Sequence, residues 1–192
     1  VVGDAPSSIV FNPIPQKIYC ANELDNTVTV IEDSTLTRLA TIPVGNSPRS
    51  LIVNENFNKI YCANYNSNSV SVIDGDVDSI ISTIGVTSHP YSMYCVKNKL
   101  YCGSYSGNMV SVINCSTDMW VSDIEVDYSP RTMVYNQLNS ELYTANLERG
   151  NLSAINVNTY SVRNIKIGAY PYSIFGAGDK LYLTDLFGSV KK

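Results

Sequence analysis

Short apolar runs alternate with polar turns along the whole chain. In the stretch 49–85 the runs cover 49–53, KIYCAN (59–64), SVSVID (69–74) and SIISTIG (79–85), and Asn, Asp, Gly and Ser fill most of the segments between them. Runs rich in Val, Ile and Tyr that are bounded by such residues are typical of β-strands joined by hairpins. No stretch keeps an apolar period of about 3.6 residues, so we expect four strands here and almost no helix in the chain.

This four-strand pattern repeats. A tyrosine in the second run of each repeat recurs every 39 to 42 residues, at Tyr19, Tyr61, Tyr101, Tyr143 and Tyr182. A proline before the first run keeps nearly the same spacing, at Pro6, Pro48, Pro90, Pro130 and Pro171. The repeats therefore divide the chain at about 1–43, 44–85, 86–125, 126–166 and 167–192.

Four antiparallel strands in a repeat of roughly 40 residues is the arrangement of a β-propeller blade. Runs such as IYCA and VSVI are apolar on both strand faces, as expected when each sheet is covered by a neighbour on either side. The pattern predicts an all-β fold, a β-propeller of four-stranded antiparallel blades with about four and a half to five repeats. We expect residues 1–192 to form a single propeller domain or a propeller fragment, as a partial or small ring.

The repeat also resembles a known family. The stretch VVGDAPSSIVFNPIPQKIYCANELDNTVTVIEDSTLTRLATIPVG (1–45) and the parallel stretch 44–85 are similar to the YVTN repeat of β-propellers. The third and fourth units drift from it, since LYCGS (100–104) and LSAI (152–155) replace the AN and VSVI of the earlier units. The resemblance implies a propeller fold and a surface-layer or secreted protein, with rings commonly of seven blades.

The end of the chain leaves two interpretations open. Gly188-Ser189-Val190 aligns with Asn68-Ser69-Val70, so the last repeat stops inside its third strand. The chain is then either an arc of a larger ring, which we favour, or a small five-bladed ring in which Val1-Val2 completes the last blade. An open arc exposes two sheet faces, which are strong surfaces for association. Ring completion by another chain, or self-assembly, is therefore expected.

Charge and composition exclude some partners. The formal net charge is −4 and the pI is about 4.9, which disfavours nucleic-acid binding because that needs clustered Lys and Arg. The apolar runs are too short for a membrane span. A chain without an initial Met is expected to be a processed product, an excised domain or a partial chain, so a signal peptide would not be seen. We expect an extracellular or cell-surface location.

Neither the cysteines nor the acidic residues predict a metal or cofactor. Cys20, Cys62 and Cys102 share one position of the second run, where a cysteine packs like a small apolar residue. Cys95 falls on a first strand and Cys115 in a turn, and no disulfide pair is evident. The D-x-D-x-D motif at 74–78 lacks the acid that a calcium loop carries at its twelfth position, where Gly85 stands.

The residues beside each repeat proline are the predicted binding site. The position after the proline reads Ser7, Arg49, Tyr91, Arg131 and Tyr172, and the position before it reads Ala5, Ser47, His89, Ser129 and Tyr170. The connection between blades leads to the innermost strand, so these side chains should meet at one rim of the central channel. Arg and Tyr suit contacts with anions, sugars and partner loops. The predicted ligand-binding residues are Arg49, His89, Tyr91, Arg131, Tyr170 and Tyr172.

No catalytic constellation is evident. The chain has one histidine and no G-x-S-x-G elbow, so we expect no catalytic residues. The leading hypothesis is a non-enzymatic propeller module for binding or assembly, at the cell surface or secreted, with a protein or carbohydrate partner. The alternatives are a propeller enzyme, either lactonase-like or dependent on haem or metal, and a structural subunit of a larger particle.

Overall fold

The protein consists of repeated antiparallel β-sheets. The computed structural model describes residues 2–168, 170–187 and 190–191. In that part of the chain, helix is limited to two single 3₁₀ turns, η1 (Glu55–Phe57) and η2 (Tyr65–Ser67). The predicted all-β class and the four-stranded antiparallel sheets are confirmed.

Each sheet follows the order of the sequence. The first contains β1 (Pro6–Asn12), β2 (Lys17–Asn22), β3 (Thr27–Glu32) and β4 (Arg38–Pro43). The second contains β5 (Pro48–Asn54), β6 (Lys59–Asn64), β7 (Ser69–Asp74) and β8 (Ser79–Gly85). The third contains β9 (Pro90–Val96), β10 (Lys99–Ser104), β11 (Met109–Asn114) and β12 (Met119–Glu125). The fourth contains β13 (Pro130–Asn136), β14 (Glu141–Asn146), β15 (Asn151–Asn156) and β16 (Val162–Lys166).

The fifth sheet has three strands, β17 (Pro171–Ala177), β18 (Lys180–Asp185) and β19 (Val190–Lys191). The third strand, β19, pairs antiparallel with β18. Gly188 and Ser189, which the repeat alignment placed at the start of this strand, lie outside the described residues, as does Val1 of the pair expected to close a small ring.

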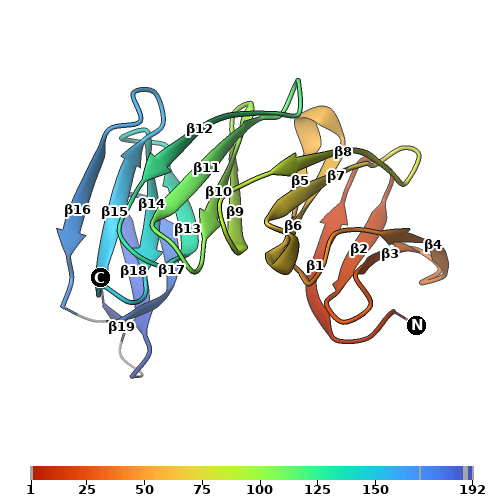
Figure 1. Ribbon diagram of the computed structural model, residues 1–192, viewed down its shortest axis with the longest axis horizontal. Coiled ribbons are helices and arrows are strands. Elements are labelled where there is room, and N and C mark those ends of the chain that lie inside the picture. Colours follow the sequence, from red (N-terminus) through yellow and green to blue (C-terminus); the bar gives the residue numbers. More distant parts are fainter. Residues whose placement is uncertain (1, 169, 188–189, 192) are drawn as a thin grey trace.

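The five sheets fan out in an arc, with the first and last sheets at opposite ends (Figure 1). The first strand of each sheet packs beside the first strand of the next, which runs β1, β5, β9, β13 and β17. These strands form the inner edge of the arc, and the fourth strands lie outside, as in propeller blades.

The core lies between successive sheets. Side chains on alternate strand positions face opposite neighbours, so Leu51 of β5 packs against the first sheet and Ile52 against the third. The tyrosines recur at a regular spacing because each repeat places one between two sheets, where Tyr19, Tyr61 and Tyr101 are fully buried. Apolar runs that looked continuous in sequence are strands covered on both faces.

A polar clamp joins neighbouring sheets at this core. Tyr19 Oη donates to Asp78 Oδ1 at 2.7 Å, and Lys17 Nζ lies 2.7 Å from Asp78 Oδ2. The next interface repeats it with Lys59 Nζ 2.7 Å from Asp118 Oδ2. Burial, and then the Asp78 carboxylate, raises the pKa of Tyr19 above its usual value. The last acid of the D-x-D-x-D motif therefore holds two sheets together.

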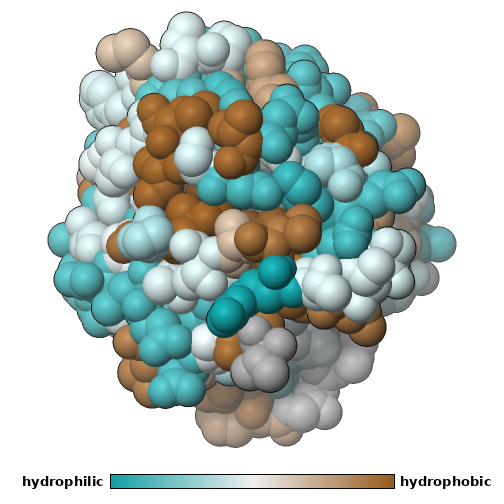
Figure 2. Space-filling model, turned by 90° about the vertical axis from the view of Figure 1, so that its right-hand side faces the viewer, coloured by the Kyte–Doolittle hydropathy of each residue, from teal (hydrophilic) through white to brown (hydrophobic). Residues whose placement is uncertain are grey.

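The two ends of the arc are apolar. On the first sheet, Ile9 is 67% exposed, whereas Leu51 at the same position of the second sheet is 6% exposed. Figure 2 shows an apolar area on this side of the molecule. On the last sheet, Phe175 is 65% exposed. These side chains occupy positions that a neighbouring sheet covers elsewhere in the arc. No helix in the described part of the chain is long and apolar enough to span a membrane.

Candidate functional site: an arginine and tyrosine rim

A β-bulge at the start of every inner strand sets the direction of the predicted site residues. In β5, Pro48 pairs with Asn64 and Ser50 with Ala63, so Arg49 has no partner in the ladder. The same shift occurs in β1, β9, β13 and β17 and leaves unpaired Ser7, Tyr91, Arg131 and Tyr172. A bulge bends the strand and turns a side chain out of the regular alternation. One exposed or half-buried residue per sheet is therefore directed separately from the core.

The residue before each proline has a left-handed backbone in four of the repeats. The φ angles are 51° at Ala5, 53° at Ser47, 53° at His89 and 65° at Ser129. At His89 two hydrogen bonds hold this conformation, because its N–H donates to Asn68 Oδ1 at 2.8 Å and its carbonyl accepts from Tyr105 N at 2.9 Å. In these four repeats the turn therefore has one conformation before the bulge, although the side chain differs.

The bulge residues of the second and third sheets meet through Tyr65. The Arg49 guanidinium carbon lies 4.5 Å from the centre of the Tyr65 ring. The Tyr65 ring lies 4.6 Å from the ring of His89 and 6.4 Å from that of Tyr91, measured between centroids. Spacings of this size are those of interacting aromatic and cation–π pairs.

The cluster continues to the fourth and fifth sheets through Arg131. Its guanidinium carbon lies 4.0 Å from the ring centre of Tyr172, 5.4 Å from that of Tyr91 and 5.9 Å from that of Tyr105. The Tyr91 and Tyr105 rings are themselves 5.0 Å apart. A continuous rim cluster thus runs across four sheets, formed by Arg49, Tyr65, His89, Tyr91, Tyr105, Arg131 and Tyr172.

Five of the six sequence-predicted residues belong to this rim cluster. The sixth, Tyr170, packs instead against Phe187, with ring centroids 5.7 Å apart. Sequence reasoning missed Tyr65 and Tyr105, which begin the turn after the second strand. The same turn position carries Glu23, Leu147 and Leu186 in the other repeats. This variation between repeats is the signal in the sequence that could have identified it.

The two arginines of the rim differ in their electrostatics. Arg49 Nε and Nη2 both donate to Glu23 Oε1, at 3.0 and 2.6 Å. Among the described residues, Arg131 forms no ion pair, and its contacts there are with tyrosine rings. His89 Nδ1 is buried without a hydrogen-bond partner in the same part of the chain.

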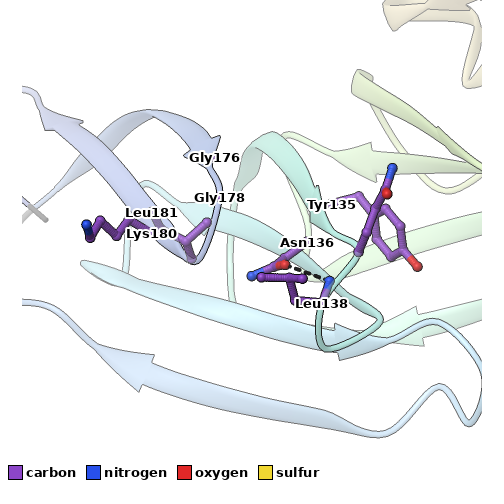
Figure 3. A pocket seen from close by; sticks show the side chains of 8 residues that line it. Tyr135, Asn136, Leu138, Gly176, Gly178, Lys180 and Leu181 are labelled. Carbon is purple, nitrogen blue, oxygen red and sulfur yellow. Dashed lines mark hydrogen bonds between the residues drawn. The ribbon is translucent and has the colours of Figure 1, made fainter.

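A separate cavity of about 320 Å³ lies between the fourth and fifth sheets (Figure 3). Its lining includes Tyr135, Leu138 and Leu181, and Asn136 Oδ1 accepts a hydrogen bond from Leu138 N at 2.9 Å. The Lys180 side chain extends away from the other lining residues. Among the described residues, no carboxylate or histidine lines this cavity, and paired acid and base groups are what proton transfer would need.

The structure changes the picture of the cysteines in one respect. Cys20, Cys62 and Cys102 are buried and free, and burial raises the pKa of Cys102 to about 12. Cys95 and Cys115, for which the sequence indicated no pair, both lie in the apolar core between the second and third sheets. The neighbouring Cys95 thiol is the largest influence that lowers the pKa of the Cys115 thiol, although burial opposes it.

Comparisons with known proteins support the fold and no more. No family model matches the chain, and no curated protein matches it. Among solved structures, the chain is similar to Kuenenia stuttgartiensis hydrazine synthase, with a TM-score of 0.76 and 23% sequence identity. The match covers 84% of this chain and 49% of that chain, so the protein spans about half the length of this structural neighbour.

Proposed function

We propose that this chain is a non-enzymatic propeller module that binds its partner through the rim cluster. The observation that carries the proposal is the origin of the cluster, which is assembled from the bulge residues of four sheets and the turn residues beside them. The core positions repeat from sheet to sheet, whereas the bulge position changes between Arg and Tyr. Arginine and tyrosine are the residues that dominate binding energy in protein interfaces.

The chemistry of the rim favours binding over catalysis. Tyrosine rings and guanidinium groups provide stacking, hydrogen bonds and charge for a ligand. The His89 ring contacts Tyr65, and among the described residues no carboxylate is hydrogen bonded to its imidazole. A general base needs such an orienting partner in the arrangements that activate a nucleophile. The same residues that would be poor at proton transfer are well suited to holding a partner.

The partner in this proposal is a protein or a carbohydrate outside the cell or on its surface. The resemblance of residues 1–45 and 44–85 to the YVTN repeat supports that location. The apolar end faces support assembly with further blades, supplied by another chain or another copy. The similar structure is named as an enzyme, so a propeller enzyme stays an alternative, either lactonase-like or dependent on haem or metal. A structural subunit of a larger particle is the other alternative.

The test is a binding screen on glycan and peptide arrays with matched variants. Tyr91→Ala and Tyr105→Ala should each reduce binding by about tenfold or more, because each removes an aromatic contact surface from the rim. Trp120→Ala is the control, since it removes an exposed aromatic ring from the outer strand β12. Equal losses in all three variants would contradict a rim site. Haem or a stoichiometric metal in the purified chain would favour the enzyme alternative.

A further inference from the structure

Arg49 and Arg131 occupy the same bulge position in the second and fourth sheets. The turn that faces each of them comes from the preceding sheet and is built in the same way. Glu23 N donates to the carbonyl of Ala5 at 2.9 Å, and Tyr105 N donates to the carbonyl of His89 at 2.9 Å. Glu23 and Tyr105 are thus equivalent residues beside equivalent arginines.

The difference between the two positions is a missing carboxylate. At Arg49, the glutamate of the turn accepts two hydrogen bonds from the guanidinium. At Arg131, a tyrosine ring stands where that glutamate would be, 5.9 Å from the guanidinium carbon. Among the described residues no other carboxylate forms an ion pair with Arg131. Within the described part of the chain, one arginine is therefore satisfied internally and the other has no ion pair.

The tyrosines around Arg131 prepare it to bind a planar anion. Tyr172 lies 4.0 Å from the guanidinium carbon, which is the distance of a stacked cation–π pair. Stacking engages the faces of the guanidinium and leaves the N–H groups at its edge available as donors. These donors match the geometry of a carboxylate. Because the rings also restrict the side chain, less conformational entropy is lost when the anion binds.

We propose that Arg131, flanked by Tyr91, Tyr105 and Tyr172, receives the carboxylate of a glutamate or aspartate on a loop of a partner protein. The inference rests on the proposed function and names the chemistry that the rim recognises. A protein loop is favoured over an acidic sugar because this chain itself shows a turn glutamate docked at the equivalent arginine. The partner would supply to Arg131 the carboxylate that Glu23 supplies to Arg49 within this chain.

The chain's own turn provides the probe. An amidated peptide with the sequence of residues 21–28, ANELDNTV, and the change Asp25→Asn presents the docked glutamate as its one carboxylate, and the same peptide with glutamine in place of that glutamate is the control. Calorimetry should show that the glutamate peptide binds the intact protein more tightly than the glutamine peptide. Arg131→Gln should weaken binding of the glutamate peptide by about 10- to 100-fold. Arg38→Gln removes one positive charge from an exposed position of β4 and should leave the affinity for the glutamate peptide unchanged.

A second variant tests the site without removing the arginine. Tyr105→Glu rebuilds at Arg131 the pair that Glu23 makes with Arg49, so it should abolish binding of the glutamate peptide without lowering the melting temperature. Equal binding of the two peptides by the unmodified protein would overturn the proposal. The proposal would also be overturned if Arg131→Gln weakened binding of the glutamate peptide no more than Arg38→Gln does.

The outcomes also separate this inference from the proposed function. Binding of glucuronic acid that depends on Arg131, without binding of the peptide, would overturn the assignment to a protein loop and leave the rim as a binding surface. If Tyr91→Ala and Tyr105→Ala reduce binding on the arrays but Arg131→Gln does not, only the carboxylate inference fails. If none of the three variants changes any binding, both fail.

Discussion

At the scale of single residues, one turn position in each repeat decides whether a carboxylate is available to hold the neighbouring sheet. The turn between the third and fourth strands carries Asp78, Asp118 and Tyr160 at one left-handed position, with φ of 53°, 53° and 62°. The two aspartates accept from a lysine and a tyrosine of the preceding sheet. Both carboxylates are therefore used inside the fold, and one of them, Asp78, is the last acid of the D-x-D-x-D motif.

Asp118→Ala should lower the free energy of unfolding by about 2–3 kcal/mol, because Lys59 and Tyr61 lose their partner in a mostly buried setting. Asp118→Asn should cost about 1 kcal/mol, since asparagine tolerates the left-handed backbone and keeps an acceptor. Urea unfolding measures both. Asp33→Ala, at an exposed turn position of the first sheet, is the control. A loss in Asp118→Ala that matches the control would show that the clamp contributes nothing.

At the scale of elements, the strands and turns could be predicted from the sequence, whereas the bulges could not. Alternation of Val, Ile and Tyr with polar turns predicts the strand from Lys59 to Asn64 and its neighbours, because side chains covered on both faces must be apolar. The bulge at Arg49 has no equally clear signal in sequence. It arises where a proline, which cannot donate to the ladder, follows a left-handed residue at the start of the strand.

Gly103→Ala is an instructive change at this scale. Alanine stands at the equivalent positions Ala21, Ala63 and Ala145, so the repeat suggests that Gly103→Ala would be harmless. The structure predicts the opposite. A Cβ there would lie 2.7 Å from Met133 Cε and 3.0 Å from the carbonyl oxygen of Pro130.

We expect Gly103→Ala to destabilise the chain by about 1–3 kcal/mol through overpacking between the third and fourth sheets. Thermal unfolding checks it. Gly85→Ala is the matched control, because its Cβ would meet no atom within 4 Å. A Gly103→Ala variant as stable as the Gly85→Ala variant would mean that Met133 and the fourth sheet adjust without strain.

At the scale of the whole molecule, the two end faces decide how the chain behaves in solution. Ile9 and Phe11 are 67% and 47% exposed on the first sheet, and Phe175 is 65% exposed on the last. Inside the arc, the positions that correspond to Ile9 and Phe11 are covered by the preceding sheet and the position that corresponds to Phe175 by the next sheet, so the end faces are surfaces built for packing.

Light scattering should therefore give a mass above the 21.1 kDa of one chain at micromolar concentration. Ile9→Asp together with Phe11→Asp should return the mass toward that of one chain, because charges on a sheet face oppose packing. Leu24→Asp, at an exposed turn, should leave the mass unchanged. A single-chain mass at every concentration would instead mean that the arc tolerates its open ends.

The sequence by itself determined the sheets of this protein, their order and their stacked arrangement. The reason is that short apolar runs covered on both faces, bounded by polar turns in a repeat near 40 residues, admit few other solutions. It also indicated five of the residues that form the rim cluster. Only the tertiary structure decided that Tyr65 and Tyr105 join them and that Tyr170 does not. Only the structure showed that Arg49 is paired and that Arg131 has no ion pair among the described residues, because those contacts join residues of different sheets.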